Sequence, residues 1–213
     1  MDMKNNIQHV WFDMDGTLTV HTADFDIVHN ELRYKAYSDV LKKPVTPNLI
    51  DDFNKMYKKC GSNSKVFTEL GKPSDFWMQY FDQIDQTRYY EPIPEIYNTL
   101  DTLKDVVSIS LFTNAKLENA HRTLEVINID SNWFTHVISG DDIKARKPAL
   151  DGFHRVIEKS GIPAKNILYV GDRVDVDILP ANQLDLQTCL VYGRSSEANY
   201  SFFKFDELLS LQN

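Results

Sequence analysis

The chain has 213 residues, a length typical of one large domain or of one domain that carries an insertion. Hydrophobic residues make up 42% and charged residues 25% of the composition, which excludes a disordered, collagen-like or disulfide-rich protein. The 23 basic and 31 acidic residues give a net charge of −8, so we expect no nucleic-acid partner.

The sequence also bears on the compartment. No apolar run approaches the ~20 residues that cross a bilayer, so no membrane association is expected. The first residues lack the apolar stretch of a secretion signal, and the two cysteines, Cys60 and Cys189, suit a reducing environment. We therefore expect a cytoplasmic protein, and the sequence leaves its oligomeric state open.

The first predicted element is a buried strand over residues 7–12. A short apolar run ends there abruptly at the polar residues Asp13 and Asp15 and at Gly16.

The segment 22–91 has a helical pattern throughout. Apolar residues recur every four positions from Val28 to Val40, and Pro47 marks the start of a second helix. A third, aromatic-rich helix opens at Ser74. We expect an all-helical region here.

Strands and helices alternate from residue 92 onward. Apolar runs predict strands over 106–112, 136–138, 167–170 and 187–192, the last of which closes the series. Helical spacing predicts a helix before the first of these strands and another after each of the first three. Such alternation predicts right-handed crossovers and a parallel sheet with helices on both faces.

These patterns together predict an α/β fold with two domains. The α/β core covers residues 1–21 and 92–213, and an inserted all-helical domain covers residues 22–91.

Polar side chains follow three of the predicted strands, where ligands bind in an open parallel sheet. Asp13 and Asp15 follow the first strand, and Thr113 and Asn114 follow the second. Asp172 and Asp177 follow the strand over 167–170. Gathering several carboxylates at one edge is unfavourable unless a cation lies among them, and Mg²⁺ is the natural oxygen-liganded choice.

A basic run supplies a positive complement. Lys144, Arg146 and Lys147 lie together, and Pro148 follows Lys147 and is expected to start the next helix. Lys147 is therefore expected to point toward the edge of the sheet. Taken singly, each of these motifs also occurs as an ordinary turn, a helix cap or a solvated basic patch.

In combination, the motifs identify a resemblance along nearly the whole chain. The sequence Asp13-Met14-Asp15-Gly16-Thr17, the strand-ending Thr113, the proline-preceding Lys147 and Gly171-Asp172 through Asp177 resemble the haloacid dehalogenase-like hydrolases, in their phosphatase branch. The resemblance implies a Rossmann-like core and a helical cap domain over the insertion. Phosphoglycolate phosphatases and β-phosphoglucomutases are members of similar organisation.

The resemblance also implies a role for each motif residue. Asp13 is expected to be the nucleophile that forms an aspartyl-phosphate, and Asp15 the general acid and base. Thr113, Asn114 and Lys147 are expected to bind the phosphate. Asp13, Asp15 through its backbone carbonyl, and Asp172 are expected to bind Mg²⁺, with Asp177 supporting them.

The expected activity is that of a phosphomonoesterase, a hydrolase that acts on a small phosphorylated metabolite. A phosphomutase of the same fold and a non-catalytic binding protein remain alternatives. The physiological substrate stays open. A loop over residues 58–65 is expected in the helical domain. Its lysines contact an anionic group while Asn63 and Ser64 contact hydroxyls, or the lysines are only solvated.

Overall fold

The computed structural model of the protein describes residues 6–212. The chain forms two compact units: one contains the residues up to Val20 and from Tyr90 onward, and the other is His21–Tyr89. Within the described range, no helix combines the length and the apolar character that crossing a membrane requires.

The larger unit is built on a six-stranded sheet in the order β3-β2-β1-β4-β5-β6, with every neighbouring pair parallel. The predicted α/β fold is therefore confirmed. The strands are β1 (His9–Phe12), β2 (Ser108–Phe112), β3 (Val137–Ile138), β4 (Ile167–Gly171), β5 (Gln187–Val191) and β6 (Tyr200–Phe202).

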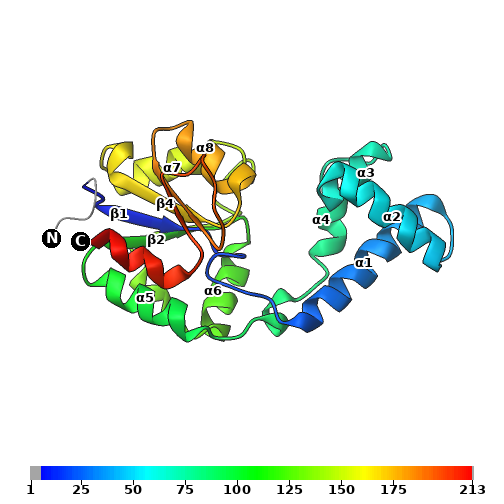
Figure 1. Ribbon diagram of the computed structural model, residues 1–213, viewed down its shortest axis with the longest axis horizontal. Coiled ribbons are helices and arrows are strands. Elements are labelled where there is room, and N and C mark those ends of the chain that lie inside the picture. Colours follow the sequence, from blue (N-terminus) through cyan, green and yellow to red (C-terminus); the bar gives the residue numbers. More distant parts are fainter. Residues whose placement is uncertain (1–5, 213) are drawn as a thin grey trace. The chain divides into compact units, whose positions relative to one another are not determined.

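Helices cover both faces of this sheet, as Figure 1 shows. Side chains alternate between the faces along β1, so Val10 and Phe12 belong to one hydrophobic cluster and Trp11 to the other. The first cluster includes residues of α5 (Pro94–Lys104), α6 (Leu117–Val126) and the 3-10 helix η5 (Phe205–Gln212). The second includes residues of α7 (Asp151–Ser160) and α8 (Leu179–Asn182).

Short helical turns connect several of these elements. They are η2 (Ser131–Trp133), η3 (Ala164–Asn166) and the π-helical turn η4 (Val174–Ile178). The turn η4 follows shortly after β4 and carries Asp175 and Asp177.

The smaller unit is helical, as its sequence pattern predicts. The Thr46 hydroxyl accepts a hydrogen bond from the backbone of Leu49 and caps the second helix. The unit has its own core around Phe53, Phe67 and Trp77. Its helices are α1 (Ala23–Leu41), α2 (Pro47–Cys60), α3 (Asn63–Glu69), α4 (Phe76–Phe81) and the 3-10 helix η1 (Gln86–Tyr89).

Several local predictions are wrong. The strand β6 and the helix η5 follow β5, so the series does not close with the strand predicted over 187–192. The three residues of β6 are too few to show a periodic pattern. Pro148 does not start a helix, because α7 begins at Asp151.

The predicted loop over 58–65 is also wrong. Lys58 and Lys59 complete α2, and Lys65 lies in α3, so only Gly61 and Ser62 separate the two helices. The three lysines are exposed. The Ser62 hydroxyl caps α3 by accepting a hydrogen bond from the backbone of Lys65, which lets the helical structure resume at once.

The packing of α7 on the sheet gives a stability prediction. A Cβ atom at Gly152 would lie 2.0 Å from Cζ of Phe112, well inside contact distance. Alanine normally stabilises a helix by about 1 kcal/mol relative to glycine, but overpacking costs about 1–3 kcal/mol. We predict that Gly152→Ala lowers the free energy of unfolding, measured by urea titration with circular dichroism.

Gly193→Ala is the matched control for this substitution. A Cβ atom at Gly193 has Leu190 Cδ2 as its nearest contact, at an ordinary 3.6 Å, and the unfolding free energy should stay within about 0.5 kcal/mol. A Gly152→Ala protein as stable as the unmodified one would contradict the close approach of α7 to β2.

Candidate active site

The central strands end at one edge of the sheet, where three of the predicted site residues follow them directly. Phe12 of β1 is in register with Val170 of β4, and the backbone N–H of Asp13 donates to the Val170 carbonyl at 2.9 Å. Thr113 follows β2 and Asp172 follows β4. Parallel register therefore brings Asp13, Thr113 and Asp172 to the same edge.

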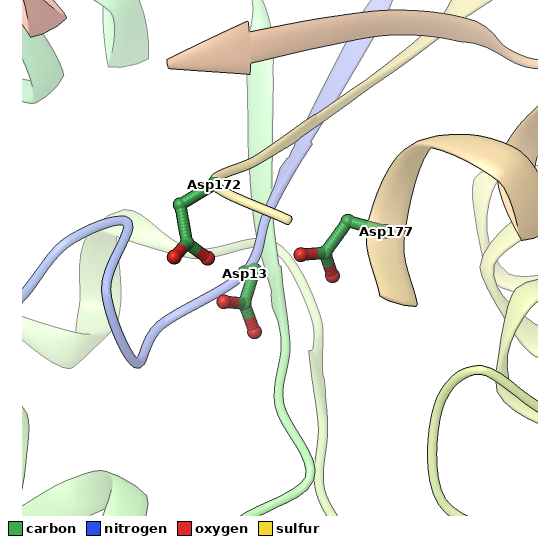
Figure 2. Close-up of side chains that lie close together, drawn as sticks. All are labelled: Asp13, Asp172 and Asp177. Carbon is green, nitrogen blue, oxygen red and sulfur yellow. The ribbon is translucent and has the colours of Figure 1, made fainter. Parts of the chain in front are cut away.

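A cluster of carboxylates lies at this edge. Figure 2 shows the side chains of Asp13, Asp172 and Asp177 close together, and one oxygen from each lies within 4.8 Å of the others. Gly16, whose φ is +89°, leaves room for the cluster, because a Cβ atom there would lie 2.6 Å from Oδ2 of Asp172. Asp177 comes from η4 and is almost completely buried.

Lys147 provides the opposing positive charge. Its Nζ lies 2.6 Å from Oδ1 of Asp13 and 2.9 Å from Oδ1 of Asp177. The Nζ also donates to the hydroxyl of Tyr169 at 2.8 Å and contacts the rings of Phe112 and Tyr169. The side chain of Lys147 is only 2% exposed, so this ion pair is shielded from solvent.

Asn114 holds the main chain of Lys147 in place. The backbone N–H of Lys147 donates to Oδ1 of Asn114 at 2.7 Å, and Nδ2 of Asn114 donates to the Lys147 carbonyl at 3.2 Å. Thr113 is fully buried, and its hydroxyl accepts a hydrogen bond from the backbone of Ala115 at 3.0 Å. The amide of Asn114 is thus engaged with the loop that carries Lys147.

The second aspartate of the first motif has a different environment. Oδ1 of Asp15 accepts a hydrogen bond from the hydroxyl of Tyr90 at 2.9 Å, and Asp15 is not part of the carboxylate cluster. The hydroxyl of Thr17 lies 3.3 Å from Oδ2 of Asp13 and donates to it. Asp15 thus accepts from Tyr90, and Asp13 accepts from Thr17.

Tyr169 and Tyr90 are residues of the site that the sequence analysis missed. Tyr169 is the one tyrosine in the apolar run that forms β4, and a polar hydroxyl in a fully buried strand signals a buried partner. Tyr90 lies 75 residues from Asp15, at the return from the helical unit. No local pattern could link Tyr90 to Asp15.

The site has an excess of negative charge. Burial raises the pKa of Asp13 to about 8; the ammonium of Lys147 opposes this shift, and the charges of Asp177 and Asp15 add to it. Burial and then the charge of Asp177 raise the pKa of Asp172 to about 6. Burial is the largest single effect on Lys147 and disfavours its charge, but Asp13, Tyr169 and Asp177 together outweigh it, so the pKa of Lys147 is raised.

The carboxylate cluster fits a hard divalent cation. Among the described residues, Oδ1 of Asp172 is a buried oxygen without a hydrogen-bond partner. Both oxygens of Asp177 already accept hydrogen bonds, one from Lys147 and one from the backbone N–H of Arg173. A bound cation would relieve the mutual repulsion and satisfy the free oxygen of Asp172.

Several proteins are similar in sequence to this chain over most of its length. Pyrophosphatase PpaX of Oceanobacillus iheyensis is 25% identical over 201 residues, which cover 92% of this chain and 88% of that protein. A glyceraldehyde 3-phosphate phosphatase of Methanocaldococcus jannaschii is 27% identical over 221 residues, with 96% and 95% coverage. A phosphoglycolate phosphatase of Neisseria gonorrhoeae is 24% identical over 177 residues, with 78% and 72% coverage.

Solved structures have the same fold. The HAD phosphatase of Thermococcus onnurineus superposes with a TM-score of 0.66 at 18% identity and covers 97% of this chain and 98% of its own. The magnesium-bound HAD-hydrolase YfnB of Bacillus subtilis has a TM-score of 0.63 at 17% identity, with 98% and 99% coverage.

The family model described as haloacid dehalogenase-like hydrolase matches residues 10–191, a range that contains the proposed site. The match confirms the family that the motif set predicts. This chain belongs to the haloacid dehalogenase-like hydrolases.

Proposed function

We propose that this chain is a Mg²⁺-dependent phosphomonoesterase that acts on a small phosphorylated metabolite through an aspartyl-phosphate on Asp13. The observation that carries the proposal is the buried contact of 2.6 Å between Nζ of Lys147 and Oδ1 of Asp13 at the end of β1. Relatives named as phosphatases and as a pyrophosphatase support this reaction class.

The first step transfers the phosphoryl group to Asp13. An oxygen of the Asp13 carboxylate forms a bond to phosphorus while the bond from phosphorus to the leaving oxygen breaks. Asp15 in its acid form donates its proton to that leaving oxygen. The hydrogen bond that the Tyr90 hydroxyl donates to Oδ1 of Asp15 orients this carboxyl group for proton transfer.

The second step hydrolyses the aspartyl-phosphate. Asp15, now ionised, accepts a proton from water, the water oxygen bonds to phosphorus, and the bond from phosphorus to Asp13 breaks. Inorganic phosphate is released and Asp15 is again an acid. Dividing the hydrolysis in this way replaces one difficult step by two easier ones.

Asp13 and Asp172, with the backbone carbonyl of Asp15, would hold Mg²⁺, and Asp177 would support them through its bonds to Lys147 and to the backbone of Arg173. When bound, the cation supplies positive charge that offsets the repulsion between a carboxylate nucleophile and a phosphate dianion.

Lys147 is proposed to neutralise charge on the phosphate and on Asp13. Asn114 was expected to bind the phosphate, and its two hydrogen bonds to the Lys147 main chain instead support a positioning role. Thr113 stays a predicted phosphate ligand. A cap role for His21–Tyr89 likewise stays a prediction.

The nucleophile assignment is tested with Asp13→Asn. A carboxamide cannot accept the phosphoryl group, so kcat for release of inorganic phosphate should fall by at least about 10³-fold. The assay uses p-nitrophenyl phosphate and a panel of phosphorylated metabolites with Mg²⁺, and circular dichroism checks the fold.

Asp24→Asn, at an exposed carboxylate of α1, is the control and should keep full activity. Substantial turnover by Asp13→Asn would refute the nucleophile assignment. Isomerisation of a sugar phosphate without release of phosphate would indicate the phosphomutase alternative instead.

The cation site is tested with Asp172→Asn. EDTA should abolish activity and added Mg²⁺ should restore it in the unmodified protein. Because burial and Asp177 disfavour the charge of Asp172 in the folded protein, Asp172→Asn should stabilise the metal-free fold at pH 8, by about 1–3 kcal/mol. The same variant should lose the rise in melting temperature that Mg²⁺ produces.

Asp175→Asn is the matched control, because Asp175 is an exposed acid of the same turn that pairs with Arg173. It should keep the Mg²⁺-dependent rise in melting temperature. An equal rise in Asp172→Asn would place the cation elsewhere.

The role of Asn114 is tested with Asn114→Ala. If Asn114 positions Lys147, its removal should lower the unfolding free energy of the ligand-free protein by about 1–3 kcal/mol and should also lower kcat/KM. A residue that contacts only the phosphate would leave ligand-free stability unchanged. Asn132→Ala, at an exposed position of the same unit, should change neither quantity.

A further inference from the structure

One aromatic residue of the catalytic unit has an unusual backbone conformation. Among the non-glycine residues that the structure describes, those with a positive φ are Asn6, Lys42, Asn128, Asp185 and Tyr192. Asparagine and aspartate adopt this conformation comparatively easily, and Lys42 is the C-cap of α1. Neither explanation applies to Tyr192, whose φ is +60°. Bulky residues are strained in this region, and strained residues concentrate at functional sites.

Tyr192 lies at the same edge of the sheet as the proposed active site. It directly follows β5, which pairs with β4 so that Leu190 is opposite Gly171. Asp172 follows Gly171, so Tyr192 and Asp172 leave neighbouring parallel strands at nearly the same level. The ring of Tyr192 packs against Phe205 of η5, with ring centroids 6.4 Å apart and an angle of 25° between the planes.

The hydroxyl of Tyr192 reaches the loop that carries the proposed nucleophile. It donates a hydrogen bond to the backbone carbonyl of Thr17 at 3.1 Å, although the two residues are 175 positions apart in the sequence. Thr17 is fully buried, and its own hydroxyl donates to Oδ2 of Asp13 at 3.3 Å. Thr17 therefore connects Tyr192 to the carboxylate of Asp13.

Hydrogen bonds within the loop do not by themselves fix it to the sheet. The backbone N–H groups of residues 17–19 all donate to one acceptor, the Met14 carbonyl, at distances of 2.9–3.2 Å. These bonds fold the loop upon itself. The hydrogen bond from Tyr192 instead ties the Thr17 carbonyl to the end of β5.

We propose that Tyr192 is a positioning residue that holds Asp13 in place for attack on phosphorus by fixing the carbonyl of Thr17. This inference rests on the proposed function of Asp13. It also accounts for the strained backbone, because the observed conformation places the ring against Phe205 and the hydroxyl against Thr17. Glycine would adopt a positive φ at no steric cost but would supply neither contact.

Hydrogen exchange of the full chain tests the positioning without an assay of activity. Tyr192→Phe keeps the ring and removes only the hydroxyl, so the Thr17 carbonyl loses its donor. The amide hydrogens of residues 13–19, followed by mass spectrometry, should exchange about 3–10-fold faster, the effect of one neutral hydrogen bond. Tyr97→Phe, the same change at a half-buried tyrosine of α5, is the matched control and should leave this exchange unchanged.

Single-turnover kinetics test the connection to Asp13. Phosphoryl transfer to Asp13 is followed by the first release of p-nitrophenolate from p-nitrophenyl phosphate with Mg²⁺. Tyr192→Phe should slow this step about 3–10-fold at saturating substrate, and the substrate concentration that gives half the maximal rate should stay within about twofold. A shift in that concentration with an unchanged maximal rate would make Tyr192 a substrate contact and would overturn the proposal.

A double-mutant cycle tests whether the effect passes through Thr17. Thr17→Val keeps the shape of the side chain but removes the hydroxyl that bonds Asp13, so it should itself slow the first turnover. Adding Tyr192→Phe to Thr17→Val should then slow the step by less than about twofold further. Two effects that multiply independently would overturn the proposed connection.

The results separate this inference from the proposed function. If Asp13→Asn keeps its turnover, the proposed function is wrong, and Tyr192 loses its catalytic purpose with it. If Asp13→Asn is inactive but Tyr192→Phe changes neither the exchange of residues 13–19 nor the first turnover, only the positioning role is wrong. Faster exchange with an unchanged first turnover would also refute that role.

Discussion

The buried contact between the ammonium of Lys147 and the carboxylates of Asp13 and Asp177 is the interaction on which the catalytic unit depends. One ammonium faces several carboxylates in a largely buried place, so the charges do not balance within the chain alone. Burial raises the pKa of Asp13, and the charges of Asp177 and Asp15 add to this shift. The same imbalance makes the site receptive to a divalent cation, which connects the electrostatics of the fold with the proposed chemistry.

Much of the surrounding structure serves to hold Lys147. The side chain of Asn114 holds the main chain of Lys147, the hydroxyl of Tyr169 accepts a hydrogen bond from its ammonium, and the ammonium lies over the rings of Phe112 and Tyr169. An ammonium placed so far from water would be unfavourable without this shell. The loop that carries Lys147 is irregular, so side-chain contacts rather than a helix or strand define its position.

The two units of the chain share one physical feature, which is buried polar atoms that lack a partner. In the catalytic unit the free atom is a carboxylate oxygen beside other carboxylates, which favours a cation. In the helical unit the unpartnered atoms are Nε of Arg33 and Oδ1 of Asn63.

The sequence by itself determined the α/β order of elements, the helical insertion and the family, because apolar periodicity and strand-end motifs are local patterns. It could not predict β6, which is too short to be periodic, or the hydrogen bond of Tyr90 to Asp15, which joins residues 75 apart. The sequence also associated Asn114 with phosphate binding, because Asn114 follows Thr113. Only the tertiary structure decided that the side-chain amide of Asn114 forms hydrogen bonds with the Lys147 backbone, because that contact depends on how two distant loops pack.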